Sequence, residues 1–310
     1  MINFRYHVVS LTAVFLALAI GLVVGTAALN GPAADALNEN INALRKSNQQ
    51  YRDQIASMQK EQSRKDDYVA ESAPYLLTSK LAGHRVVVVV LPGNGRDYAK
   101  GISTQLTAAG AKITGTVALN DKIVDPENST ELMELSEKVL PPSIPATSLP
   151  SNSDAVETAS ALLASVLMDR SPAVPAADMS AVLTAFNKAG YLSVDGKVSG
   201  PAEAVVMVSG MPYTDTAASD KNNNVQTAVV QFDKAGSIVV AGVLGGDGNV
   251  ITGVREDPAL VKSVSTVDDA STLQGQVVSA LAAWEQLVQG KTGQYGVGSG
   301  ATSLMPKYPA

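Results

Sequence analysis

The strongest hydrophobic pattern is an uncharged stretch at residues 8–29, built mainly from Leu, Val, Ile, Ala and Gly. Only Ser10, Thr12 and Thr26 interrupt it with hydroxyl groups. As a helix rising about 1.5 Å per residue, this stretch is roughly 33 Å long, enough to cross a hydrocarbon core of about 30 Å. A buried helix of a water-soluble domain rarely stays apolar on every face for so long. The pattern therefore predicts one transmembrane anchor within residues 1–30.

The flanks of this anchor indicate its orientation. Arg5, beside His7, carries the positive charge that precedes it, which places the N-terminus in the cytoplasm and the bulk of the chain outside. A cleaved signal peptide is the alternative, because Thr26, Ala27 and Ala28 supply small residues. Signal peptides usually have about 7 to 15 apolar residues, so the length favours a permanent anchor. We expect a single-pass protein of the cell membrane.

Small residues recur every four positions along this helix. They are Ala13, Ala17, Gly21 and Gly25. Residues spaced in this way share one helix face, and the Gly-x-x-x-Gly pair lets two backbones approach closely. Small residues are also common in membrane helices generally. The stripe is nevertheless the expected helix-packing surface within the membrane.

A polar segment with a heptad pattern follows at residues 31–70. Its apolar positions alternate in steps of four and three, and the predicted seam is Leu37, Ile41, Leu44, Asn48, Tyr51, Ile55 and Met58. Such a seam is typical of a coiled coil, and an Asn at an a position fixes register and oligomer state. We expect a homodimer, preferably parallel, or a hetero-complex with a partner helix. A surface helix packed on its own domain has the same pattern.

Residues 84–290 alternate between apolar runs and helical patterns. Runs at 86–91, 113–119, 204–208 and 238–244 are typical of strands buried on both faces. Helical spacing occurs at 96–109, 154–168, 179–189, 224–234 and 272–287. The fold class is therefore α/β: an extracytoplasmic domain with an open, mostly parallel sheet, after a transmembrane helix and a coiled coil. Residues 291–310, with Gly, Ser and Pro, are predicted to form a flexible tail.

Composition narrows the chemistry. The net charge is −6 and basic residues form no stripe, so nucleic acid is not an expected partner. The chain has no cysteine, which excludes disulfides, thiolate metal sites and thiol nucleophiles. The lack of cysteine is compatible with export to an oxidising envelope, and equally with chance.

Two glycine-rich loops follow predicted strands, where α/β sheets bind ligands. The loop at 92–95 resembles a dinucleotide loop only in part, because Tyr98 stands where the third glycine belongs. The loop at 245–248 either lines a crevice or forms a simple turn. The histidines are His7 and His84, and the Gly-x-Ser-x-Gly elbow is absent, so we expect no enzyme activity.

In a chain without cysteine, copper ligands would come from methionine and histidine, since Cu(I) favours sulfur and also binds imidazole. Met207 and Met211 lie nearest one another around the end of a predicted strand, and His84 precedes another. Packing in the core explains the methionines equally well. No catalytic, cofactor-binding or metal-binding residue is assigned from these patterns.

Residues 1–25, reading MINFRYHVVSLTAVFLALAIGLVVG, resemble the start of the actinobacterial MctB family, described as copper transport outer membrane proteins. Ser-Thr-Val-Asp-Asp at 265–269 and the pattern Gly290-x-x-Gly293-Gln294-Tyr295-Gly296 resemble the same family. With both ends matched, the resemblance covers nearly the whole chain.

The resemblance implies a role in copper efflux or tolerance, with a pore in an outer membrane. Members are also described as SteB, thought to act in cell separation with a SteA-like membrane protein and to regulate peptidoglycan hydrolases through the coiled coil. Copper and outer-membrane placement are implied by the resemblance only. Two hypotheses follow: a coiled-coil scaffold for cell-wall hydrolases, and a copper transport component. One anchor and a stalk favour the scaffold, because a pore needs more membrane-spanning surface than one helix.

Overall fold

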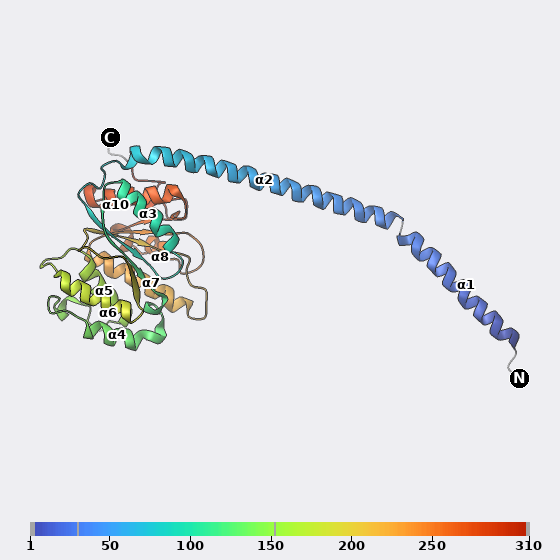
Figure 1. Cartoon of the computed structure of the whole chain (residues 1–310), viewed down its shortest axis with the longest axis horizontal. Coiled ribbons are helices and arrows are strands. Elements are labelled where there is room, and N and C mark those ends of the chain that lie inside the picture. Colours follow the sequence, from blue (N-terminus) through green and yellow to red (C-terminus); the bar gives the residue numbers. More distant parts are fainter. Residues whose placement is uncertain (1–3, 30, 152, 308–310) are drawn as a thin grey trace. The chain divides into compact units, whose positions relative to one another are not determined.

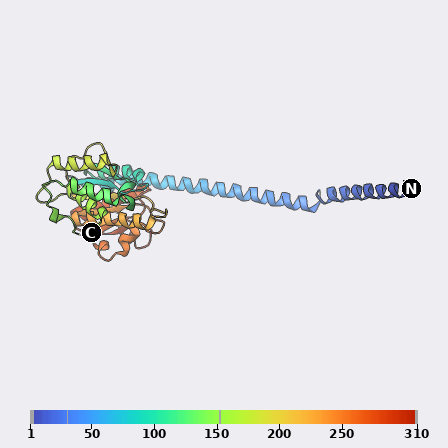
Figure 2. The ribbon, with the colours of Figure 1, turned by 90° about the horizontal axis from the view of Figure 1, so that it is seen from below.

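The computed structural model describes residues 4–29, 31–151 and 153–307, and the chain divides into two compact units, Met1–Lys65 and Asp66–Ala310. The first unit contains α1 (Phe4–Leu29) and most of α2 (Pro32–Leu77), each of which is one uninterrupted helix in Figure 2. Asp35 in the first turn of α2 complements the helix dipole. Side-chain pairs four residues apart support α2 further along, as between Glu61 and Lys65 at 3.1 Å.

The second unit is built on a seven-stranded sheet with the order β3-β2-β1-β4-β5-β6-β7. Its strands are β1 (Arg85–Val90), β2 (Lys112–Leu119), β3 (Leu192–Asp195), β4 (Ala204–Val208), β5 (Ser237–Ala241), β6 (Val264–Val267) and β7 (Gln294–Tyr295). The β2–β3 pair is antiparallel and the other five pairs are parallel. The prediction of a mostly parallel α/β sheet is confirmed.

Helices cover both faces of this sheet, as Figure 1 shows. They are α3 (Arg96–Ala108), α4 (Ser129–Lys138), α5 (Ala155–Leu167), α6 (Ala176–Lys188), α7 (Ala218–Ala235), α8 (Val250–Glu256), α9 (Leu260–Ser263) and α10 (Leu273–Gln289). α3 and α10 lie on one face, whereas α4, α5, α6 and α7 lie on the other. The arrangement explains why the strands are apolar runs, since each strand has a packed layer on both sides.

Two hydrophobic cores result, one on each side of the sheet. In β1, Val86 and Val88 belong to the core with α3 and α10, whereas Val87 and Val89 belong to the core with α4–α7. All four side chains are fully buried. Alternation of side chains along a strand therefore distributes a single valine run between both cores.

The structure corrects two predicted boundaries. The compact unit begins at Asp66, before the predicted start at residue 84, because Leu77 and Leu81 are fully buried beside α10 residues in one core. The segment from residue 291, predicted to be a flexible tail, is tied to the domain, because β7 extends the sheet, Tyr295 is 4% exposed, and the Thr302 backbone nitrogen donates to the Gln294 carbonyl at 2.7 Å. Strands β3, β6 and β7 were not predicted.

Candidate functional site

The predicted seam lies along one exposed stretch of α2. Its apolar side chains are between 36% and 69% exposed, and Asn48 is exposed as well; the set is Leu37, Ile41, Leu44, Asn48, Tyr51, Ile55 and Met58. Polar residues make up most of the remaining surface, and Gln49 donates a hydrogen bond to Asp53 at 2.9 Å. A line of large apolar side chains on an otherwise polar helix is a surface suited to another helix.

The same heptad frame continues into the α/β domain, where its apolar positions pack against the core of that domain. Val69 and Leu76 fall at a positions and pack partly buried against the core that contains α3 and α10. Between the exposed and the packed stretch, the frame places Gln62 and Lys65 at its a and d positions. After residue 66 the apolar face of α2 packs on the core of the α/β domain, whereas the seam side chains at residues 37–58 are exposed.

α1 is the one described helix that is long and apolar enough to cross a membrane, with a mean hydropathy of 2.6 over Phe4–Ala27. Two of its hydroxyl groups are satisfied within the helix, since Thr12 donates to the Val8 carbonyl at 2.8 Å and Thr26 to the Val23 carbonyl at 3.1 Å. A membrane interior requires this satisfaction because it holds no water to hydrogen-bond. The N-terminal helix is therefore suited to membrane anchoring.

The predicted packing stripe on α1 is exposed at Ala13, Ala17, Gly21 and Gly25. Apart from the adjoining residues and the backbone of the helix itself, no described atom lies within 4 Å of where a Cβ would stand on Gly21 or Gly25. The stripe is therefore open to a neighbouring helix, and helix pairing in the membrane stays a prediction.

The crevice in which open α/β sheets bind nucleotides is closed. From β1 the chain continues to one side of the sheet, through β2 and β3, and from β4 it continues to the other side, through β5, β6 and β7. A ligand crevice is therefore expected at the carboxyl ends of β1 and β4. There, a Cβ on Gly95 would stand 2.7 Å from the Val208 carbonyl oxygen, and one on Gly210 would stand 2.6 Å from the Asn94 nitrogen. The two loops contact each other through their backbones. The loop at 92–95 is therefore a tight turn packed against its neighbour.

The copper candidates lie apart. His84 precedes the amino end of β1, and its Nδ1 lies 2.7 Å from Glu203 Oε2. Met207 is fully buried in β4, whereas Met211 lies beyond the carboxyl end of β4 and is 51% exposed. The described residues contain no group of three or more His, Asp or Glu placed to hold a metal ion. The fold therefore does not bring these three residues together as one ligand set.

His84 belongs instead to a surface charge cluster at the amino ends of β1 and β4. Arg85 lies 2.6 Å from Asp169 and 3.3 Å from Glu203. Burial alone would raise the pKa of Glu203, but the hydrogen bond and charge of His84, together with Arg85, lower that pKa below its ordinary value. The cluster ties the strand ends together.

A second polar network joins residues 265–269 to residues 293–296. Sequence reasoning did not predict that these two segments contact each other. Thr266 contacts Gln294 side chain to side chain at 2.5 Å, and Arg255 donates to Thr266 Oγ1 at 2.9 Å. Arg255 also pairs with Asp268 at 2.8 Å. Thr266 and Gln294 are both buried polar side chains, and no sequence pattern links them. Their buried bonds hold β6 and β7 together.

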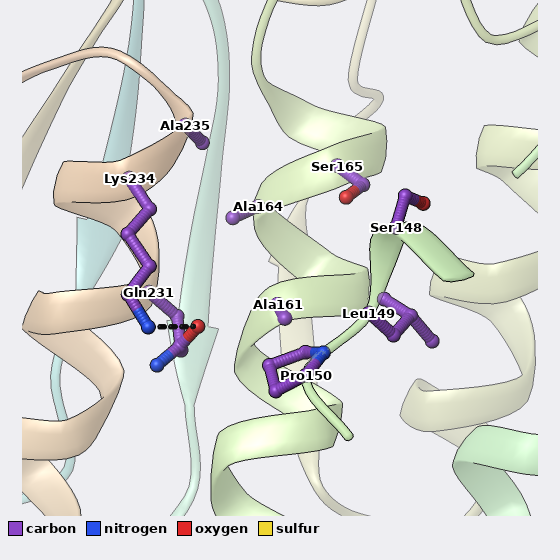
Figure 3. Close-up of a pocket in the computed structure, with 9 residues that line it drawn as sticks. All are labelled: Ser148, Leu149, Pro150, Ala161, Ala164, Ser165, Gln231, Lys234 and Ala235. Atoms are coloured by element: carbon purple, nitrogen blue, oxygen red, sulfur yellow. Dashed lines mark hydrogen bonds between the residues drawn. The ribbon is translucent and has the colours of Figure 1, made fainter. Parts of the chain in front are cut away.

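A cavity of about 300 Å³ lies beside α5 and α7, next to residues 148–150. Figure 3 shows the residues that line it. Small side chains, including Ala161 and Ala164, line much of it. Its charged group, Lys234, donates to Gln231 at 3.4 Å and lies 3.7 Å from Glu157. The groove thus presents mainly small apolar surface and an already paired ammonium.

Relatives match almost the entire chain. The profile of a family described as "Copper transport outer membrane protein, MctB" matches residues 1–306. The protein named "Copper transporter MctB" from Mycobacterium tuberculosis (strain ATCC 25618 / H37Rv) is 27% identical over 310 residues, covering 98% of this chain and 99% of the relative. The protein of the same name from Mycobacterium leprae is 29% identical over 319 residues, with the same coverage. The similarity includes α1, α2 and the α/β domain.

Proposed function

This chain belongs to the MctB family, and we propose on that premise that it is a membrane-anchored scaffold of the cell envelope whose stalk helix binds a partner helix. The family is described by copper transport and not by an enzymatic reaction. The observation that carries the proposal is the exposed apolar seam at residues 37–58 of α2, the helix that follows the membrane helix in the chain.

The proposed assembly is a parallel pair of stalk helices or a stalk bound to a partner's helix. Burial of one leucine-sized side chain contributes about 1.5–3 kcal/mol, so six exposed seam side chains are a substantial driving force. Asn48 supplies the register preference, because an unpaired buried amide disfavours other alignments. Parallel pairing also brings two α1 helices together in the membrane, and the stripe with Gly21 and Gly25 is the face expected to pack there.

The proposed cellular role is to recruit or activate peptidoglycan hydrolases during cell separation, together with a SteA-like membrane protein. An anchor and an exposed helical seam suffice for this role, and no reaction at the scaffold is needed. In this proposal the N-terminus is cytoplasmic and the domain extracytoplasmic, as Arg5 before the anchor favours.

Cysteine cross-linking tests the stalk directly, because the chain has no native cysteine. Leu44→Cys places a thiol at a d position, whereas Lys46→Cys places one at an f position two residues away. Under mild oxidation of membranes, we expect a disulfide-linked dimer from Leu44→Cys and little from Lys46→Cys. Equal yields would contradict parallel pairing through this seam. No dimer from Leu44→Cys would leave the hetero-complex as the remaining assembly.

Copper homeostasis is the second proposed function, and the family description together with the names of the relatives favours it. His84 lies at the amino end of β1, Met207 is buried within β4, and Met211 is exposed beyond the carboxyl end of β4. We therefore propose that any effect on copper passes through a partner bound at the stalk or through envelope integrity.

The two functions separate in a copper challenge of a strain that lacks the gene. Complementation uses the wild type, a seam variant with Ile41→Asp, Leu44→Asp and Ile55→Asp, and a control with Asn42→Asp, Lys46→Asp and Gln50→Asp outside the seam. We expect the deletion to accumulate copper, the control to restore low copper and the seam variant to fail at equal expression. Full restoration by the seam variant would separate copper handling from the stalk.

A further inference from the structure

A polar cavity of about 450 Å³ lies near the carboxyl ends of β4 and β5. It is lined by the loop after β4, the first turns of α7 and the glycine-rich loop at 245–248. The side chains that decide its chemistry are Tyr213, Thr214, Ser219, Asn222, Asn223 and Asp247. The volume is within the range of about 300–1,000 Å³ for small-molecule sites. Neither the scaffold nor the copper role uses this cavity.

Asn222 holds the two loops of the cavity in place. It is 8% exposed, accepts a hydrogen bond from the Tyr213 backbone nitrogen at 2.9 Å and donates to the Tyr213 carbonyl at 3.1 Å. Its amide also reaches the Asp247 carbonyl at 3.5 Å. Gly248 has φ +77°, and a Cβ there would stand 2.6 Å from the Asn222 amide nitrogen. One buried side chain therefore shapes the cavity before any ligand arrives.

Tyr213 is an aromatic residue of the cavity lining, and its side chain is held at two points. Its hydroxyl donates to Asp121, and the Lys221 ammonium lies 5.4 Å from the ring centroid. Lys221 is itself bound to Asp215 at 2.8 Å, outside the lining. A fixed ring offers packing surface at low entropic cost.

The lining selects among ligand classes. Among the described residues, no Lys, Arg or His lines the cavity, so an anion would meet no positive side chain. Within that described lining Asp247 is the one carboxylate, too few for a hard cation that takes six or more oxygens. Ala218 is its one aliphatic side chain, so a hydrophobic ligand would leave the amides and hydroxyls unsatisfied. An uncharged ligand rich in donors and acceptors remains.

We infer that this cavity binds a short glycan segment. Sugar hydroxyls both donate and accept hydrogen bonds, as the Asn amides and the Ser and Thr hydroxyls here require. The apolar C–H face of a sugar ring complements an aromatic ring such as Tyr213. Thr214, Ser219, Asn223 and Asp247 are exposed, so a chain of sugars can enter from solvent. The glycine-rich loop at 245–248 is then part of a binding site.

Calorimetric titration of the full-length chain tests this site, in a detergent without a sugar headgroup. The probes are N,N′-diacetylchitobiose and maltose, with inorganic phosphate as the anionic comparison. Ser219→Trp fills the cavity from the exposed first turns of α7, and Thr104→Trp on exposed α3 surface is the matched control. We expect saturable binding of at least one disaccharide, weakened about tenfold or more by Ser219→Trp and unchanged in Thr104→Trp.

Asn223→Ala is the second variant, used with Ser219→Trp so that a folding defect in one does not decide the result. It removes an exposed amide from the lining and is expected to weaken disaccharide binding several-fold. Binding that both cavity variants leave intact would overturn the proposal. So would binding of phosphate in place of sugars, or no binding of either disaccharide to the wild-type protein.

Discussion

Arg255 and Asp268 form a buried ion pair, with Arg255 Nη1 2.8 Å from Asp268 Oδ2 and side chains 2% and 0% exposed. Asp268 also accepts hydrogen bonds from the Val297 and Gly298 backbone nitrogens at 3.0 and 2.9 Å. Arg255 donates to the Tyr295 and Ser299 carbonyls at 2.8 and 3.0 Å. The pair thus fastens the segment after β7 to β6 and α8.

The first prediction concerns this pair. Asp268→Asn leaves the Arg255 charge buried without its partner, and breaking such pairs typically costs about 3–5 kcal/mol. We expect a large loss in the free energy of unfolding, measured by urea denaturation of the full chain followed by circular dichroism. Lys65→Ala removes an exposed ion pair and should leave stability nearly unchanged. A small effect of Asp268→Asn would show that the segment is held by its backbone bonds alone.

The second prediction concerns the closed crevice between β1 and β4. Gly95→Ala and Gly210→Ala each force a methyl group onto backbone atoms, so we expect destabilisation of about 1–3 kcal/mol by overpacking. Gly253→Ala on α8 is the matched control, because its Cβ would meet the movable end of Gln226 at 2.9 Å. Thermal unfolding of the three variants distinguishes these cases. Equal midpoints for all three would mean that the two loops separate readily.

The third prediction concerns pH. The pKa of Glu203 is lowered in the folded protein, so its contribution to stability is present above the unfolded-state pKa and is lost as pH falls through the folded-state pKa. Glu203→Gln should therefore flatten the acid limb of the plot of urea midpoint against pH. Glu134→Gln, an exposed site on α4, should leave that limb as it is. An unchanged acid limb in Glu203→Gln would show that the pair with His84 contributes nothing to stability.

The fourth prediction concerns pairing of α1 in the membrane. Gly21→Leu adds a side chain on the small-residue stripe and separates two helices that approach there. In the Leu44→Cys background, we expect a lower yield of cross-linked dimer. Leu22→Ile, one position off the stripe, should keep the yield of its parent. If both variants cross-link alike, the stalk pairs without help from the anchor.

Sequence patterns sufficed where a segment is long and repetitive. The valine run of β1 predicts a strand because every position in it is apolar, and burial of both faces is what that composition requires. The two N-terminal helices, α1 and α2, are equally legible, because helical periodicity is local and repeats over many turns. Pairing through the seam on α2 stays a prediction.

Short strands were not recognisable. β3 and β6 have four residues each and β7 has two, so each becomes a strand only by pairing with its neighbour. The start of α7 was predicted late because its Asn-rich first turns favour coil locally. Burial and hydrogen bonding of Asn222 in the folded domain override that preference.

The sequence by itself determined the order of parts: an apolar helix, a heptad helix and an α/β domain, each from periodicity within one segment. Tertiary structure alone decided which distant residues meet. The closed crevice at Gly95 and Gly210, the pair of Arg255 with Asp268, and the cavity beside Tyr213 all join separate loops. Their contacts depend on how the strands are ordered and packed, and the spacing of residues along a chain carries no record of that order.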